Sequence, residues 1–291
     1  MPENQLTVWA FRVAFTVIDP VRFPEGKAAN TLRGALGTVL RDNYSCSYLL
    51  TRLFESRTTA AGLRLANPPK PFLLRAAHLD GKSFDPGQSM YFDLILFEDP
   101  RQLLPDFIDV FRRWQRTGIG PAHGKVALST VTNQSTGEPD DYSGHPVSLQ
   151  PSESQLDRLT LEFLTPTELK SRGDVAPTLE FHILIRRLRE RISNLRILYQ
   201  GGSELESNHL GEPEAIVILR TSLRQVDIER RSSRTGQRHS IGGFVGQVEY
   251  SGDLWRFIPL LKAGEWTGVG RQTVWGKGQY VVLGTKADSA A

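Results

Sequence analysis

The chain has 291 residues, of which 39% are hydrophobic, so it can bury the core of one large domain or of two ordinary ones. Its formal net charge is only +3 although the sequence pI is near 9.0, so clustering of basic residues says more about a polyanionic partner than the total does. The single cysteine, Cys46, excludes an internal disulfide, and the six scattered histidines offer no zinc spacing.

No targeting or membrane-spanning segment is indicated. The first residues lack a basic region followed by an apolar one, and no stretch of eighteen or more apolar residues exists. We therefore expect a cytoplasmic protein that binds no membrane and uses no metal or other cofactor.

The first half of the chain predicts the order strand, helix, strand, strand, helix, strand. Residues 6–18 are rich in Val, Phe, Trp and Thr, which favours a strand. Thr31 is the expected N-cap of a helix over residues 32–44, where apolar residues recur at helical spacing. An irregular proline-rich stretch, a strand at 91–97 and an amphipathic helix at 101–116 follow, and a glycine-marked loop leads into the last strand.

The same order returns in the second half of the chain. A polar run at 132–154 is typical of a linker, and a strand is predicted directly after it. A long helix at 178–199 carries one apolar face. Two strands joined by a basic turn, a short helix at 253–264 and a final strand at 278–284 complete the unit.

These patterns predict an α+β fold of two tandem ferredoxin-like domains, each βαββαβ, RRM-like and built on an antiparallel sheet. The expected parts are an N-terminal domain at 1–131, a linker at 132–154, a C-terminal domain at 155–284 and a tail at 285–291. The open face of such a sheet can bind something flat or extended, such as single-stranded RNA.

A glycine-rich segment near the end of the chain reads GVGRQTVWGKGQY, residues 268–280. Glycine lets successive backbone amides face one concavity, which suits a phosphate. The spacing fits neither a P-loop nor a dinucleotide fingerprint. We expect a generic anion cradle that binds through Gly268, Gly270, Arg271 and Lys277. A tight connection between helix and strand is the alternative.

Basic residues gather in two further places. The expected RNA contacts on the predicted strand pair are Arg230, Arg231, Arg234, Arg238 and His239. On the long helix, Arg187 and Arg191 lie one turn apart beside the apolar stripe and are expected to contact the same ligand. A solvated surface is the alternative for both groups.

Several segments resemble a known family. The CRISPR precursor-RNA processing endoribonucleases of the RAMP superfamily have a C-terminal signature very similar to GGFVGQVEYSGDLWRFIPLLKAGEWTGVGRQTVWGKGQY. Looser similarity extends to LTLEFLTPTELK and RRLRERISNLRILYQGG, and in the first half to TLRGALGTVLR, SYLLTRLFES and DPGQSMYFDLILF. The resemblance therefore covers most of the chain.

The resemblance implies a protein that binds CRISPR repeat RNA and cuts the precursor without a metal. In that reaction a 2′-hydroxyl attacks the adjacent phosphorus and leaves a 2′,3′-cyclic phosphate and a 5′-hydroxyl. The implied partners are the repeat RNA and a CRISPR effector complex, with no specific DNA. Such chemistry needs alignment of the attacking oxygen, an acid and a base, and positive charge on the phosphorane.

The expected catalytic region departs from the family pattern. Relatives take the acid or base from a histidine in or after the first helix, but residues 23–54 contain none, and Thr38 stands in its place. The candidate catalytic residues are Arg33, Thr38, Tyr44 and His123, and Arg41 is expected to bind the RNA. An arginine can stabilise a phosphorane but stays protonated, so it makes a poor base.

Two other interpretations stay open at this point. The missing histidine favours a RAMP protein that holds CRISPR RNA without cutting it. A small-molecule enzyme that grips a substrate phosphate would need a pocket with convergent acid and base groups, and the sequence shows no such set.

Overall fold

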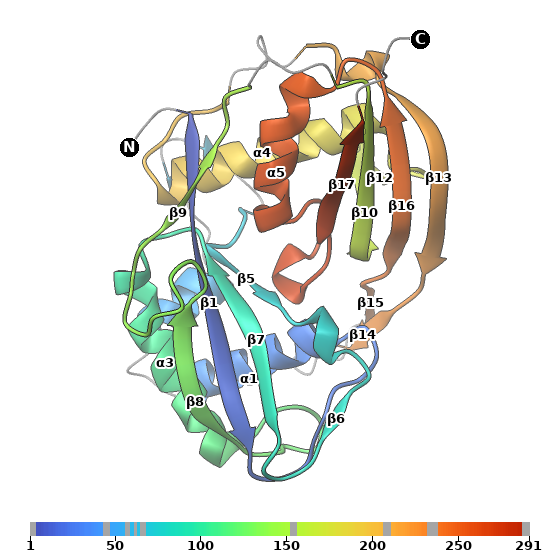
Figure 1. Cartoon of the computed structure of the whole chain (residues 1–291). Coiled ribbons are helices and arrows are strands. Elements are labelled where there is room, and N and C mark those ends of the chain that lie inside the picture. Colours follow the sequence, from blue (N-terminus) through green and yellow to red (C-terminus); the bar gives the residue numbers. More distant parts are fainter. Residues whose placement is uncertain are drawn as a thin grey trace.

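The structure is a computed structural model of the chain. It describes residues 4–42, 47–55, 59–60, 63–64, 68–151, 156–205, 211–231 and 238–286. Two domains lie against each other, and each consists of a sheet with two helices packed on one face (Figure 1). Within these residues, none of the helices combines the length and the apolar composition that crossing a membrane requires.

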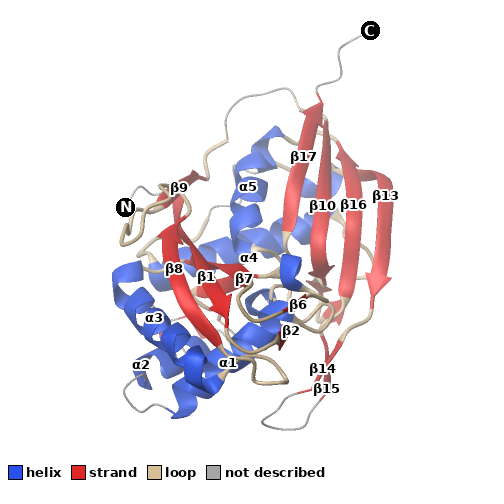
Figure 2. Cartoon of the chain, turned by 60° about the horizontal axis from the view of Figure 1, so that its bottom comes forward, coloured by secondary structure: helices blue, strands red, loops and turns tan. Residues whose placement is uncertain are grey.

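The first domain has the predicted βαββαβ order. Its main elements are β1 (Gln5–Val17), α1 (Ala28–Asp42), β5 (Phe72–Arg75), β7 (Ser89–Leu96), α3 (Pro100–Thr117) and β8 (Val126–Asn133). The strands lie in the order β5-β7-β1-β8, and each pairs antiparallel with its neighbours. This is the ferredoxin-like arrangement, with α1 and α3 on the same face of the sheet (Figure 2).

Short elements decorate this domain. They are β2 (Val21–Arg22), α2 (Ser47–Leu50), a π-helical turn (Thr51–Glu55), β3 (Thr59–Ala60), β4 (Leu63–Arg64), β6 (Ser83–Phe84) and β9 (His145–Ser148). Strand β9 lies inside the polar run expected to be a linker and pairs with the first residues of β1. Part of that run therefore extends the first sheet.

The second domain repeats the pattern. Its main elements are β10 (Arg158–Thr167), α4 (Phe181–Tyr199), β13 (Val217–Val226), β16 (Gly243–Ser251), α5 (Ile258–Thr267) and β17 (Tyr280–Lys286). The sheet order is β13-β16-β10-β17, again antiparallel, so both predicted ferredoxin-like domains are present. Two small hairpins, β11 (Lys170–Ser171) with β12 (Asp174–Val175) and β14 (Glu229–Arg231) with β15 (Arg238–Ser240), project from it.

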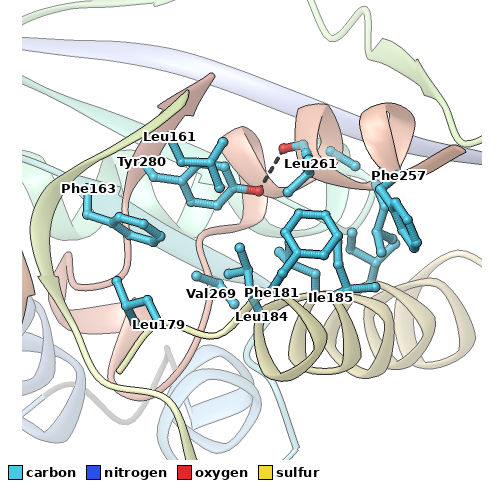
Figure 3. Close-up of a cluster of buried hydrophobic side chains, with 14 of the residues drawn as sticks. Leu161, Phe163, Leu179, Phe181, Leu184, Ile185, Phe257, Leu261, Val269 and Tyr280 are labelled. Atoms are coloured by element: carbon cyan, nitrogen blue, oxygen red, sulfur yellow. Dashed lines mark hydrogen bonds between the residues drawn. The ribbon is translucent and has the colours of Figure 1, made fainter. Parts of the chain in front are cut away.

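The apolar stripe of α4 forms the centre of the second core. Phe181, Leu184 and Leu188 are all buried, as their helical spacing predicts. They pack with side chains from β10, α5 and β17 (Figure 3). Tyr280 spans this core and donates a 2.7 Å hydrogen bond to the carbonyl oxygen of Leu261, so its buried hydroxyl is satisfied.

The two domains share a hydrophobic core. Leu6 and Val8 of β1, and Phe97 directly after β7, belong to the same buried cluster as the α4 and α5 side chains. Gln200, just after α4, donates to the carbonyl oxygens of Thr7 at 2.7 Å and Phe97 at 3.0 Å. The expected open face of the first sheet is thus partly covered by the second domain.

The start of α1 differs from the prediction. The helix begins at Ala28, so Thr31 lies inside it and is not its N-cap. The amide of Ala28 donates a 2.7 Å hydrogen bond to Oδ1 of Asp80 instead. This cap comes from a segment about fifty residues away, a distance that local sequence patterns do not reach.

Candidate functional site

A cleft of about 250 Å³ opens between α1 and the loop that joins α3 to β8; we call it the α1 cleft. Its walls are formed by Asn30, Thr31, Arg33, Gly34, Ala35, Thr38, Thr117, Gly118, Gly120, Pro121 and His123. Three of the four expected catalytic residues therefore share one cleft although they come from two elements far apart in the sequence. The fourth, Tyr44, lies outside the described residues.

The α3–β8 loop owes its shape to tight backbone packing. Gly118 ends α3 with φ 69°, and a Cβ there would stand 2.0 Å from the carbonyl oxygen of His123. The amide of Ile119 donates to the carbonyl oxygen of Gly124 at 2.9 Å and closes the loop. His123 has φ 51°, in the left-handed region, and its side chain is exposed on the wall of the cleft.

Thr38 is tied to its own helix. Its hydroxyl donates a 3.1 Å hydrogen bond to the carbonyl oxygen of Gly34, one turn earlier. Arg41 in turn donates to the Thr38 hydroxyl oxygen at 3.5 Å. The Arg41 guanidinium therefore lies beside Thr38 on the exposed side of α1.

Arg33 connects the α1 cleft to the second domain. Its guanidinium carbon lies 4.4 Å from the ring centre of Phe54 and 5.7 Å from that of Trp275. Trp275 belongs to the glycine loop of the second domain. Aromatic faces attract a cation, so these rings hold the Arg33 guanidinium where the two domains meet.

Lys70 and Arg52 add positive charge near Arg33. Burial lowers the pKa of Lys70, and the charges of Arg33 and Arg52 lower it further. Arg52 pairs with Glu98 at 2.6 Å. The sequence analysis does not single out Lys70, because a lysine in a proline-rich stretch has no recognisable pattern and only the fold brings it near Arg33.

The glycine loop of the second domain is largely closed by its own hydrogen bonds. The amides of Val269 and Gly278 donate to the carbonyl oxygens of Gly278 and Pro166 at 2.9 and 3.1 Å. A Cβ on Gly278 would stand 1.9 Å from the carbonyl oxygen of Val269. The expectation of a cradle of bare amides is corrected at these positions, because the glycines here permit a tight connection.

Lys277 and Gly276 dock this loop on the first domain. Lys277 is only 4% exposed, and its ammonium donates a 2.7 Å hydrogen bond to the carbonyl oxygen of Gly26. Burial lowers its pKa, an effect that the charge of Asp80 opposes. A Cβ on Gly276 would lie 2.6 Å from the Cβ of Ala29. This location argues against the expected RNA contact of Lys277.

Gly268 is also expected to line the cradle. It is buried at the end of α5, where its amide donates to the carbonyl oxygen of Gly264.

A second cleft, of about 240 Å³, lies between α4, the edge of the glycine loop and the first domain. We call it the α4 cleft. Four expected contacts meet there, Arg187, Arg191, Gly270 and Arg271, together with Pro69, Lys170, Glu190 and Asn194. The prediction that α4 and the glycine loop act on one ligand therefore has a geometric basis at this cleft.

The remaining expected contacts lie on the β14–β15 hairpin. Arg230 pairs in register with His239, and Arg231 with Arg238. Arg238 is exposed and its guanidinium lies 3.4 Å from the carboxylate of Glu229. Arg234 falls outside the described residues, as do the side chains of Arg230, Arg231 and His239. The backbone thus places a basic hairpin beyond the second sheet.

The groups available for chemistry are cations, an imidazole and hydroxyls. Over the described part of the chain, no cluster of three or more His, Cys, Asp or Glu side chains could hold a metal ion.

Comparison with known proteins identifies the class. Residues 161–280 match the sequence model of the CRISPR-associated endoribonuclease Cas6, and residues 6–155 match a model described as an N-terminal domain. No curated protein matches the chain.

Solved structures show the same fold. A Thermus thermophilus Cas6 is 17% identical over 95% of this chain and 98% of its own, with a TM-score of 0.58. A Cas6 product complex is 17% identical over 95% and 99%, with a TM-score of 0.60. A partial Cas6-RT-Cas1–Cas2 complex is 12% identical over 100% of this chain and 48% of that one, with a TM-score of 0.61.

Two tandem ferredoxin-like domains are the fold that this chain shares with the Cas6 structures. The second domain carries the region, residues 161–280, that matches the Cas6 endoribonuclease model, and this match supports a Cas6/RAMP-type family of CRISPR RNA processing.

Proposed function

We propose that the chain binds the repeat of a precursor CRISPR RNA and cuts it in the α1 cleft. The observation that carries this proposal is that the fold joins Arg33, Thr38 and His123 on the walls of one cleft. The ribose 2′-oxygen forms a bond to the adjacent phosphorus, and the bond from phosphorus to the 5′-oxygen breaks. The 2′-hydroxyl loses its proton and the leaving 5′-oxygen gains one, so the products are a 2′,3′-cyclic phosphate and a 5′-hydroxyl.

Arg33 and His123 have the central roles in this proposal. The guanidinium of Arg33 stabilises the extra negative charge of the phosphorane, which it can do without changing protonation. The imidazole of His123 is the group that exchanges a proton with the reacting oxygens, because an imidazole has one ring nitrogen that can accept a proton and one that can donate. Thr38 holds Arg41, which binds the RNA backbone.

Lys70 supports the same reaction from the domain boundary. Its ammonium adds positive charge near Arg33, and we assign it this electrostatic role. No step of the proposed reaction requires a metal.

The test is cleavage of a labelled repeat RNA in the presence of EDTA. We expect one major product whose 3′ end resists phosphatase until mild acid opens the cyclic phosphate. A product with a free 3′-hydroxyl, or cleavage only when a divalent metal is supplied, contradicts the proposed mechanism.

A second candidate function is binding of CRISPR RNA without cleavage. The absence of histidine from residues 23–54 favours it, because the first helix then lacks the usual acid or base. Tight binding of the repeat with no product over hours would select this candidate over the enzyme. Either way, the affinity should fall steeply with salt, because many arginines release counterions, whereas a single small phosphate ligand depends on salt only weakly.

We also propose a CRISPR effector complex as the protein partner. Two structural neighbours are Cas6-RT-Cas1–Cas2 complexes, and the occurrence of this fold in a larger assembly supports the proposal. The test is co-purification of effector subunits with the tagged chain, before and after RNase treatment. Subunits lost on RNase treatment are held by the RNA, and subunits retained are held by the protein surface.

A further inference from the structure

The α4 cleft holds more positive charge than the described residues balance. Arg187 donates to Glu190 at 2.6 Å and Arg271 pairs with Glu168, so two of its cations have carboxylate partners. Lys170 and Arg191 form no ion pair among the residues that the structure describes. The cleft therefore keeps two cations without counterions, on opposite elements, around one cavity.

Arg191 is the least satisfied of these cations. Its Nε donates to the carbonyl oxygen of Thr267 at 2.9 Å, which fixes the plane of the guanidinium. Its Nη2 nitrogen is shielded from solvent and has no hydrogen-bond partner within the described part of the chain. Burial lowers the pKa of Arg191 to about 10, yet the group is still charged near neutral pH. A shielded donor of a charged group is costly to leave unsatisfied, so the arrangement is best explained by an anion that binds there.

The cleft has the features of a site for a tetrahedral oxyanion. Arginine presents its donors in a planar fork that matches phosphate geometry, and here the fork is held in place before any ligand arrives. Arg187 is fixed in the same way, since its Nε donates to the carbonyl oxygen of Lys170 at 2.8 Å. Asn194 and the backbone at Gly270 line the same cavity and can add neutral polar contacts.

The α4 cleft is separate from the α1 cleft, yet the two are connected. Pro69, which lines the α4 cleft, precedes Lys70, whose pKa is lowered in part by the charge of Arg33 on the α1 cleft. Tyr199 of α4 donates a 2.7 Å hydrogen bond to the carbonyl oxygen of Pro69 and holds this link in place. Lys70 is thus next in the chain to the α4 cleft and close enough to Arg33 of the α1 cleft for the two charges to interact.

We propose that the α4 cleft, through Arg191, Arg187 and Lys170, binds a single phosphodiester of the RNA away from the bond that is cut. This anchor sets the register of the strand, so that the scissile phosphate falls in the α1 cleft. The identity of the anion as RNA rests on the proposed function, but the anion site itself does not. The general ligand class is a phosphate, free or esterified.

The first experiment uses inorganic phosphate alone. Thermal unfolding of the full chain is followed in phosphate and in chloride at equal ionic strength, for the wild type, Arg191→Gln and Arg186→Gln. Arg186 lies on the same helix, is exposed, and donates only to the Ser171 hydroxyl at 3.4 Å, so it is the matched control. We expect phosphate to raise the melting temperature of the wild type and of Arg186→Gln, and not of Arg191→Gln.

The free Arg191→Gln protein gives an independent signature. Because the substitution removes a charge that has no counterion among the described residues, together with its unsatisfied Nη2 donor, its melting temperature in chloride should equal or exceed that of the wild type. An arginine that only supported the fold would show the opposite. If Arg191→Gln does not fold, Arg191→Lys keeps the charge but replaces the planar guanidinium by a single ammonium, and it should retain less than half of the phosphate shift. An equal shift in wild type and variant overturns the proposal.

The second experiment uses repeat RNA. Arg191→Gln should weaken binding at least tenfold and lower the slope of log affinity against log salt by about 0.7 to 1, as for one lost phosphate contact. Any cleavage that remains should spread to neighbouring bonds. If Arg191→Gln binds RNA with the wild-type affinity and salt slope and cuts it normally, the phosphate anchor is overturned and the proposed function stays intact. A phosphate shift in a wild type that never binds or cuts RNA would contradict the proposed function and the RNA anchor while the anion site stands.

Discussion

The two domains place a glycine-marked loop at the same point of the fold, between the second helix and the last strand, and use it differently. In the first domain, the loop at 118–124 forms one wall of the α1 cleft and exposes His123. In the second domain, the loop at 268–278 engages most of its amides internally and buries Lys277 against Gly26. The two loops are equivalent in the fold, but the first forms a wall of a cleft and the second joins the two domains.

The comparison teaches that glycine content does not identify a ligand site. Gly118 and Gly278 both allow a backbone contact that a Cβ would forbid. What differs is the surroundings, because α1 leaves space beside the first loop whereas both domains close around the second. The edge of the second loop, at Gly270 and Arg271, lines the α4 cleft.

The largest effect should come from Gly278→Ala. A methyl group there meets the carbonyl oxygen of Val269 at 1.9 Å, and φ is 73°. Backbone strain and overpacking together should cost about 3 to 5 kcal/mol, or roughly 10 °C in melting temperature. Gly120→Ala in the first loop has no atom closer than 3.4 Å to the added carbon, so it should cost only about 1 kcal/mol. Equal melting temperatures for the two variants would contradict the assignment of different roles.

His123→Asn should have the largest effect on the reaction itself. Asparagine tolerates the left-handed backbone at this position better than alanine does, so the loop should keep its shape. The single-turnover rate at saturating RNA should fall by about 10² to 10⁴, because a proton-transfer group is lost. RNA affinity should stay within threefold. His182→Asn, on α4, is the control; a rate for His123→Asn as high as that of this control excludes His123 from catalysis.

Arg33→Lys should lower the same rate by about 10² to 10³, because an ammonium cannot place two donors on the phosphorane as a guanidinium does. The charge is kept, so RNA binding should change little. Arg113→Lys, on an exposed face of α3, should behave as the wild type. If affinity and rate fall together in Arg33→Lys, the residue binds the ground state and has no special role in the transition state.

Lys70 should give the reaction a dependence on alkaline pH. Its pKa is lowered, so the active ammonium is lost as the pH rises through that value, and cleavage should slow below the pH at which an ordinary lysine titrates. Lys70→Arg stays charged over the same range and should remove that fall. The measurement is the single-turnover rate from pH 6 to pH 10; the same alkaline fall in both proteins would show that another group titrates.

The smallest effect on RNA should come from Lys277→Met. The ammonium is buried and bound to Gly26, so affinity should change by less than twofold, whereas a loss of tenfold would restore Lys277 as an RNA contact. The free energy of unfolding should change with pH as Lys277 titrates. The folded pKa lies below the ordinary 10.5, so between those values the unfolded chain binds more protons and wild-type stability rises with pH. Relative to Lys277→Met, the wild type should gain stability over that window.

Much of this molecule could be predicted from its sequence. Strand and helix periods identify both ferredoxin-like domains, since the core-facing stripe of α4 repeats with helical spacing. That Arg33 and His123 line the same cleft could not be predicted from the sequence pattern, because it depends on how α3 and its loop pack beside α1. Lys70 and Asp80 were missed for the same reason, as both act on residues distant in the chain.

In the second glycine loop, the structure corrects the expected bare amides at Gly268 and Gly278, which are hydrogen-bonded, whereas Gly270 and Arg271 line the α4 cleft. The sequence shows that the backbone is free of side chains, but not which acceptors its amides find. Those acceptors come from Glu168 and Pro166, at the end of β10 in the same domain, and the buried partner of Lys277 comes from the first domain.

The most direct test of the account is crosslinking at the bond that is cut. A repeat RNA with a 2′-deoxy sugar at the scissile position cannot react, and a photoreactive base placed next to that position reports what lies beside it. The account predicts crosslinks to peptides from residues 30–38 and 117–123. Crosslinks concentrated in residues 272–278, with none at the α1 cleft, would show that the second glycine loop holds the scissile phosphate and would contradict the central claim.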